Sequence, residues 1–203
     1  MKNRNLAPLA LGLLAFTLGS GSASAGGSMP QLSQEDLQER IAANREAIQQ
    51  FAQSLQGELM SAMQSGGPTE AIQVCNERAP EIARDISAET GIDIGRTSLK
   101  LRNPDNAPDR WERLTLQGFE AQHAAGMPAA DLPPRYGVVE SDEGQPEFRF
   151  MAAIPTGGAC LVCHGSNVSG DVKHALERLY PDDQATGYSE GQVRGAFTIT
   201  QEM

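Results

Sequence analysis

The sequence predicts an α+β fold in which helices precede an antiparallel sheet. Two N-terminal segments, 33–65 and 68–90, carry apolar residues at helical spacing. Later segments instead alternate apolar and polar residues, as half-buried strands do. Two of them, 136–140 and 147–154, flank a Ser-Asp-Glu-Gly turn and are typical of a hairpin. Because the N-terminal helices and the hairpin are separated along the chain, we expect the strands to form an antiparallel sheet.

Residues 1–25 are typical of an export signal. A basic start, a short apolar core and a cleavage site follow one another as Lys2 and Arg4, Leu6 to Leu18, and Ala23-Ser24-Ala25. Residues 26–32 indicate a flexible leader, rich in small residues. The remaining residues, 33–203, are long enough for one domain with a hydrophobic core. We therefore expect a periplasmic protein of a single domain.

The charge balance limits the classes of partner. The net charge is −10 at pH 7, and it becomes −12 once Lys2 and Arg4 leave with the signal. An acidic chain of this kind argues against binding of nucleic acids or anionic membrane surfaces. No segment after the signal is apolar enough to span a bilayer, so we expect a soluble protein.

The segment 33–65 predicts one long helix, which begins at Ser33 in a capping pattern with Asp36. Its apolar stripe consists of Leu37, Ile41, Ile48, Phe51, Leu55, Leu59 and Met63. We expect this stripe to pack against the rest of the domain, and its length also allows a homodimer interface. A second helix begins near Pro68, kinks or restarts at Pro80 and ends at Gly91. Its apolar face includes Cys75.

The remaining elements follow in order along the chain. Residues 92–101 predict a strand with an irregularity near Gly95, and a short helix around Trp111 comes next. After the hairpin, residues 171–179 predict a short helix and 192–200 a last strand.

The clearest motif is Cys160-Leu161-Val162-Cys163-His164, the C-x-x-C-H attachment signature of c-type haem. Two cysteines at this spacing lie on one turn and can form thioethers to the two vinyl groups of one porphyrin. The histidine that follows supplies an axial nitrogen to the iron. C-type haem is attached outside the cytoplasm, which agrees with the export signal. The motif thus predicts one covalent haem c.

Other uses of the two cysteines are less favoured. A thioredoxin-like C-x-x-C begins a helix after a strand, whereas glycines at 157, 158 and 165 indicate a loop. A zinc site needs a second pair of ligands, and Cys75 is the only other cysteine. A structural disulfide is the remaining alternative.

The second axial ligand is open on the sequence alone. Its candidates are Cys75, His123, His174, Met127 and Met151, or no residue at all. Cys75 has no partner for an internal disulfide once the other two cysteines hold haem. It is equally well explained as a small buried apolar residue. The two histidines and the methionines are each better explained as surface or packing residues.

Basic residues near the predicted site are candidates to pair with the haem propionates, since a guanidinium matches a carboxylate in shape and charge. They are Arg96, Lys100, Arg102 and Arg194. Each of them singly is explained at least as well by a solvated surface.

Three stretches together resemble a family of single-haem c-type proteins with a PAS-like fold. They are 71–83 around Cys75, 96–112 with its Arg-Asn-Pro and Asn-Ala-Pro-Asp runs, and the haem motif followed by 180–188. The resemblance covers nearly the whole domain and implies a PAS-like antiparallel sheet that carries haem c. It also implies an unusual His/Cys axial pair, which maps onto His164 and Cys75. It leaves the physiological role open.

Function is predicted from the ligand set. A haem iron with two protein ligands favours single-electron transfer with a redox partner protein, and a thiolate ligand favours a low potential. The alternative is a redox or gas (NO or CO) sensor in which Cys75 is displaced and a signalling partner reads the change. An enzyme of peroxidase type needs an open face with an acid–base residue, and the sequence shows no distal His–Arg motif. We therefore do not expect an enzyme.

Overall fold

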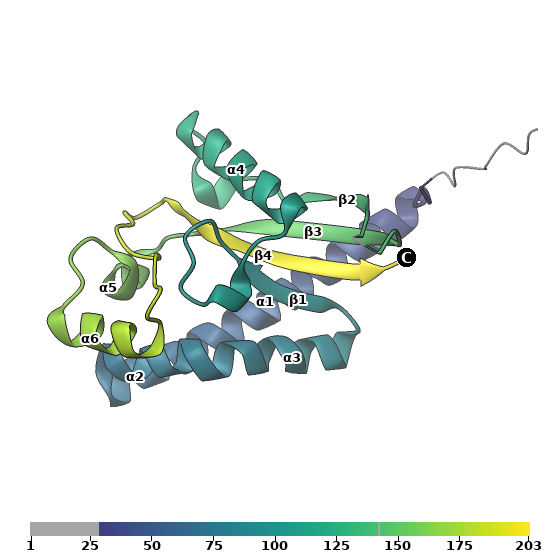
Figure 1. Cartoon of the computed structure of the whole chain (residues 1–203). Coiled ribbons are helices and arrows are strands. Elements are labelled where there is room, and N and C mark those ends of the chain that lie inside the picture. Colours follow the sequence, from purple (N-terminus) through teal and green to yellow (C-terminus); the bar gives the residue numbers. More distant parts are fainter. Residues whose placement is uncertain (1–28, 142) are drawn as a thin grey trace, which may run out of the picture.

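The computed structural model describes residues 29–141 and 143–203. The predicted signal, 1–25, and the first part of the predicted leader, 26–28, lie outside the described residues. The described chain folds into a four-stranded antiparallel sheet with helices on both faces, which confirms the α+β class (Figure 1). The strand order is β1-β4-β3-β2, so the C-terminal strand lies inside the sheet.

Two helical segments cover one face of the sheet. Helix α1 spans Gln34–Ser65, and the Ser33 hydroxyl accepts a hydrogen bond from the backbone N–H of Asp36, as its capping pattern predicts. The second segment comprises α2 (Gly67–Gln73), a π-helical turn (Val74–Arg78) and α3 (Ala79–Thr90). Gly91 ends α3 in the left-handed conformation, at φ 71°.

The π-helical turn is the form that the predicted interruption near Pro80 takes. A proline inside a helix has no N–H to donate, and its ring clashes with the preceding turn. The helix widens just before it, so that the N–H of Ala79 bonds to the carbonyl of Val74, five residues back. Cys75 therefore lies on a widened turn, where π-helical geometry is often found at functional sites.

The sheet consists of β1 (Asp93–Thr97), β2 (Arg135–Glu140), β3 (Pro146–Pro155) and β4 (Val193–Glu202). The predicted hairpin is confirmed as β2 and β3, in which Tyr136 pairs with Phe150. The strand predicted at 92–101 is half as long in the structure. The chain leaves the sheet at Ser98, because the Ser98 hydroxyl bonds to the Arg194 carbonyl and accepts from the N–H of Lys100, which forms a local turn.

The main core lies between the sheet and helices α1 and α3. Its fully buried aromatic residues are Phe51, Phe148 and Phe150. Phe51 of α1 meets Phe197 of β4 edge to face, with ring centroids 5.6 Å apart. Ile41 and Phe51 of the predicted stripe are buried, whereas Leu59 and Met63 are only half-buried near the end of the helix.

Helix α4 (Arg110–Ala124) packs on the opposite face of the sheet (Figure 1). Leu116 and Phe119 of this helix contact Met151 of β3 in a second core. A buried ion pair between Glu112 and Arg149 crosses from the helix to the sheet. Because Phe150 and Met151 point to opposite faces, the strand alternation predicted for this segment is confirmed.

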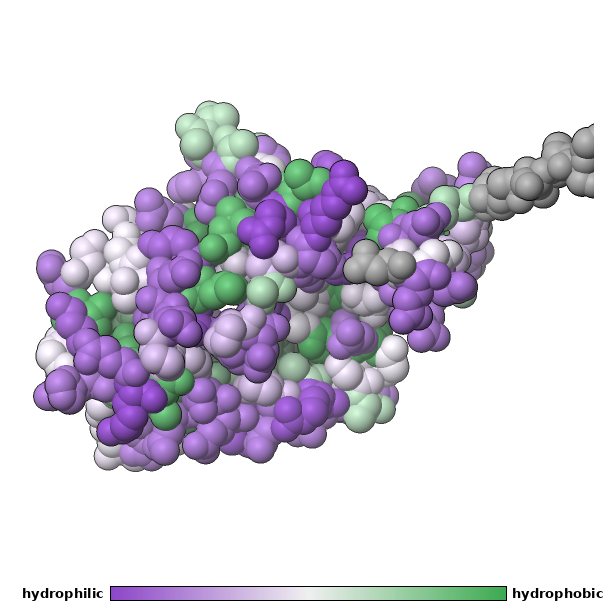
Figure 2. Space-filling model, in the orientation of Figure 1, coloured by the Kyte–Doolittle hydropathy of each residue, from purple (hydrophilic) through white to green (hydrophobic). Residues whose placement is uncertain are grey.

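Two short helices, α5 (Leu161–His164) and α6 (Gly170–Leu179), lie together at one end of the molecule, beside α2 (Figure 1). Three single turns of 3-10 helix complete the described elements, at Pro104–Asn106, Ala129–Asp131 and Gly158–Cys160. Among the described residues, no helix is both long and apolar enough to cross a membrane. The face seen in Figure 2 is mainly hydrophilic, and its hydrophobic areas are small and separate.

Candidate haem-attachment site

The C-x-x-C-H motif forms one helical turn, as its spacing predicts. Cys160 ends a 3-10 turn and the next four residues form α5, so both cysteines belong to one compact loop. Cys160 is exposed, and Cys163 is half-buried against a small apolar cluster that includes Ile72 of α2. Both thiols are free. The loop thus presents two free thiols beside the helix that leads to Cys75.

His164 has the form of a metal ligand. Its Nδ1 lies 2.7 Å from the carbonyl of Ala185 and 3.2 Å from Nε of Arg194. The shorter contact is to an oxygen that can only accept, so we assign the proton to Nδ1, which leaves the Arg194 contact without a hydrogen bond. The other nitrogen, Nε2, keeps its lone pair and lies 3.4 Å from a guanidinium nitrogen of Arg102. Burial, with the positive charges of Arg194 and Arg102, lowers the pKa of His164 to about 2. The ring is therefore a neutral imidazole whose Nε2 lone pair, now in contact with Arg102, is the one that a metal would take.

Arg102 joins the attachment loop to a later segment of the chain. Its side chain is only 8% exposed and forms a two-pronged ion pair with Asp183, at 3.2 and 3.0 Å. The same guanidinium donates to the carbonyl of Cys163 at 2.6 Å and to that of Ala185 at 3.3 Å. The prediction that Arg102 meets a propionate remains a prediction, and the structure adds that Asp183 already neutralises this charge.

Cys75 lies in the same site. Burial raises the pKa of its thiol, and nearby positive charges act in the opposite direction, those of Arg96, Arg102 and Arg194. The charge of Cys75 raises the pKa of Cys163, and that of Cys160 raises the pKa of Cys75, so the three sulfurs are near one another. The fold therefore brings the third cysteine to the attachment loop, across 85 residues of sequence from Cys160.

Two arginines of the site have no carboxylate partner among the described residues. The guanidinium of Arg96 lies 5.5 Å from the ring centroid of Phe51, and burial lowers its pKa. Arg194 donates to the Ser98 hydroxyl at 3.0 Å and to the Lys100 carbonyl at 3.4 Å. Guanidinium groups without carboxylates are the donor set that the two propionates of a haem require. The residues present thus fit the group that the motif predicts.

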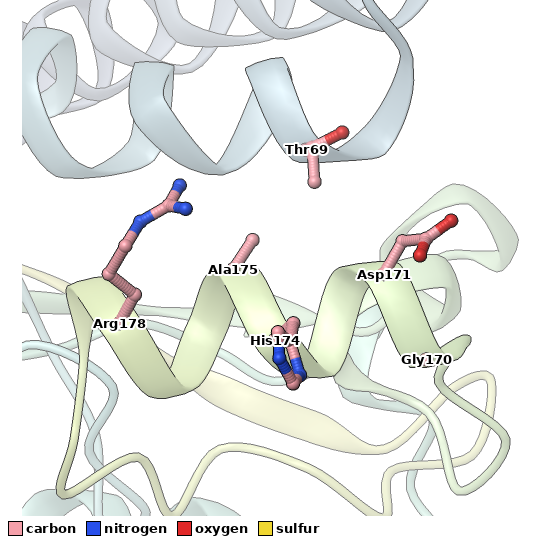
Figure 3. Close-up of a pocket in the computed structure, with 6 residues that line it drawn as sticks. All are labelled: Thr69, Gly170, Asp171, His174, Ala175 and Arg178. Carbon is pink, nitrogen blue, oxygen red and sulfur yellow. The ribbon is translucent and has the colours of Figure 1, made fainter.

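The other candidate axial ligands lie elsewhere. His123 bonds to the Met127 carbonyl at 2.9 Å at the end of α4, and Met151 is fully buried in the core beneath that helix. His174 is 91% exposed and lies 3.8 Å from Glu177. Figure 3 shows the groove between α2 and α6: the side chains of Asp171, Ala175 and Arg178 face α2, whereas that of His174 points to another side. Cys75 is thus the one candidate that the described structure places beside the motif.

Sequence reasoning missed the residues that hold His164. Asp183 acts by pairing with Arg102, and Ala185 acts through its backbone carbonyl. A backbone carbonyl is present in every residue, so no sequence pattern could have indicated it. Tyr188 also escaped notice: its ring meets that of His164 edge-on, with centroids 6.3 Å apart. Tyr180 is also buried, and burial raises the pKa of its hydroxyl. The only signal was the position of these residues inside the stretch 180–188 that carries the resemblance.

Comparisons with known proteins agree with this picture. The family model described as Tll0287-like matches residues 32–201. A solved structure, described as the crystal structure of the cyanobacterial heme-protein Tll0287, is 21% identical to this chain. The match covers 85% of this chain and 98% of that one, with a TM-score of 0.59. At this identity the likeness supports the fold alone. Among curated proteins, none matches this chain.

Proposed function

Because the chain belongs to the Tll0287-like family, we propose that it is a haem protein that holds one haem c covalently and works in single-electron transfer. The solved relative is itself described as a heme-protein. The observation that carries the proposal is the geometry of His164, whose Nδ1–H is fixed on the Ala185 carbonyl. Its Nε2 keeps the lone pair, and His164 directly follows the second of the two thiols, in the order that thioether attachment requires.

Cys75 is the sixth ligand in this proposal. It is free, half-buried and close to Cys163, whereas the other candidates lie in the core, on the surface or at the end of α4. Burial raises the pKa of its thiol, and the positive charges of Arg96, Arg102 and Arg194 oppose that rise, so the thiolate in this proposal depends on binding to the iron. A bound haem supplies an iron that exchanges one electron at a time, and a thiolate ligand favours its ferric state.

The arginines have two different roles in this proposal. Arg96 and Arg194 lack carboxylate partners among the described residues, and we assign them to the haem propionates. Arg102 is paired with Asp183 and bonded to the Cys163 carbonyl, so its part in binding haem is to hold the attachment loop. The predicted periplasmic location and the lack of enzymatic turnover belong to the same proposal.

A redox or gas sensor is the second candidate, and one observation favours it. Cys75 lies on the π-helical turn, and Arg78 of the same turn is paired with Glu58 of α1 through two contacts of 2.7 Å. If Cys75 leaves the iron on reduction, the change of this turn would reach α1 through that pair. A partner protein that contacts α1 would then read the redox state.

The test uses optical spectra of the exported protein in both oxidation states. We expect haem that resists extraction by acidified solvent, and a ferric spectrum with thiolate features that is lost in Cys75→Ala. His174→Ala is the matched control, since its side chain points away from the site, and its spectrum should equal that of the wild type. A Cys75→Ala spectrum unchanged from wild type overturns the His164/Cys75 pair.

The same samples separate the two roles. Six-coordinate iron in both states, with no binding of carbon monoxide by the ferrous protein, supports electron transfer. Loss of the sixth ligand on reduction, followed by carbon monoxide binding, supports the sensor.

A further inference from the structure

The segment 183–188, called the latch below, covers the attachment loop, residues 158–164. The N–H groups of Gly187 and Tyr188 donate to the carbonyls of Gly165 and His164, at 3.1 and 2.9 Å. These bonds form an isolated parallel bridge between Gly165 and Tyr188. The latch is thus joined by its backbone to the residue that carries the axial imidazole, and the position of the latch fixes that of His164.

One carboxylate organises this latch from within. Asp183 is 10% exposed and accepts the two-pronged contact from Arg102. Its Oδ1 also accepts from the backbone N–H of Ala185, at 2.8 Å. Ala185 then offers its carbonyl to Nδ1 of His164, at 2.7 Å. The order Arg102, Asp183, Ala185, His164 is therefore one chain of contacts, and each step is a hydrogen bond of normal length.

The ring of His164 is also confined from the side. Tyr188 is 8% exposed and meets the imidazole edge to face. Two cations hold the tyrosine ring in place, with Lys100 at 4.6 Å and Arg194 at 5.3 Å from its centroid. The imidazole plane thus has a hydrogen bond at one edge and an aromatic ring beside it, which leaves it little freedom to turn.

We propose that Asp183 is the positioning residue for His164: held by Arg102, it fixes the Ala185 carbonyl that sets the tautomer and the plane of the axial imidazole. This inference rests on the proposed haem ligation. A hydrogen bond from Nδ1–H to a fixed acceptor makes Nε2 a stronger donor to a metal. Stronger donation stabilises ferric iron, so Asp183 keeps the reduction potential low without touching the haem.

The experiment compares Asp183→Asn with Asp182→Asn in the haem-loaded protein. Asp182 is the exposed neighbour, and no hydrogen bond or ion pair of its side chain is found in the described structure, so its change removes the same charge without disturbing the latch. We expect Asp183→Asn to lower the preference for ferric over ferrous iron about tenfold, which raises the midpoint potential by about 59 mV for one electron. Its ferric electron paramagnetic resonance should broaden as the imidazole plane varies. Asp182→Asn should match the wild type in both readouts.

Equal shifts in the two variants, or none in Asp183→Asn, overturn the inference, because charge alone would then account for the result. If Asp183→Asn does not accumulate as folded protein, Arg102→Lys decides in its place. A lysine keeps the charge but cannot form the two-pronged contact, so the same rise and broadening are expected. A wild-type protein without covalent haem would overturn the proposed function itself, which distinguishes that failure from this one.

Discussion

The pair of Glu112 and Arg149 lets the stability of the scaffold be tested with a worked magnitude. Glu112 of α4 is 10% exposed at its side chain, and its Oε1 accepts from Thr198 at 2.6 Å and from Arg149 at 3.2 Å. Its Oε2 accepts from the backbone N–H of Asp109 at 3.0 Å, which closes the capping box of the helix. This one carboxylate therefore joins α4 to strands β3 and β4, which lead into and out of the site.

The substitution Glu112→Gln replaces one acceptor oxygen with an amide donor. Whichever way the amide turns, one donor loses its partner, either the buried Arg149 or the half-buried N–H of Asp109, at a cost of about 1–3 kcal/mol. The ion pair with Arg149 is lost as well, although Asp109 still lies 2.8 Å from that guanidinium and limits the loss. The cost thus stays at the low end of the range for a broken buried pair, about 3 kcal/mol. For a domain of this size we expect the melting temperature to fall by about 6–12 °C.

Thermal unfolding followed by circular dichroism measures this change. The matched control is Glu147→Gln: its carboxylate lies 3.8 Å from the same guanidinium and is 24% exposed. A longer and more solvent-exposed ion pair contributes about 0–1 kcal/mol to the free energy of unfolding. The control should therefore melt within about 4 °C of the wild type. Equal shifts in the two variants would refute the reasoning, because burial and geometry would then make no difference to the pair.

Two glycine pairs test the backbone. Gly91→Ala forces a side chain into the left-handed region, at φ 71°, and should destabilise by about 1–2 kcal/mol in urea denaturation. Gly57→Ala, inside α1 with open space around it, should stabilise by about 0.5–1 kcal/mol, and a loss there contradicts the helix assignment. Gly195→Ala sets a Cβ against the Thr97 carbonyl and 3.1 Å from the Ser98 side chain, so it should part β1 from β4 and weaken the fold. Gly137→Ala meets nothing within 4 Å, and a cost as large as that of Gly195→Ala would contradict this account.

The attachment residues could be predicted from the sequence because their chemistry is local. The spacing of Cys160, Cys163 and His164 places them on one turn whatever the rest of the fold does, and the structure forms that turn. Family membership was also readable, because the resemblance lay in short runs of residues and the family model matches 32–201. Predicted elements with a local signal, such as the cap at Ser33 and the hairpin of β2 and β3, are confirmed for the same reason.

The strand predicted at 92–101 shows where local reasoning stops. Apolar residues continue to Leu101, yet the chain leaves the sheet at Ser98, whose hydroxyl bonds to the carbonyl of Arg194 on a strand almost 100 residues later. The interruption predicted at Pro80 was correct in place, but the sequence did not predict its π-helical form or the contact of Arg78 in this turn with Glu58 of α1. Both outcomes depend on contacts that no local pattern encodes.

The sequence by itself thus determined the fold class and the haem motif, since each is written in residues that are neighbours along the chain. Only the tertiary structure decided which residues surround that motif. Cys75 reaches the attachment loop because α2 packs beside α5, and Arg102 is neutralised because the latch returns Asp183 to it. The physical reason is that coordination, ion pairing and hydrogen bonding depend on distance in space. Chain folding sets that distance, and sequence separation does not.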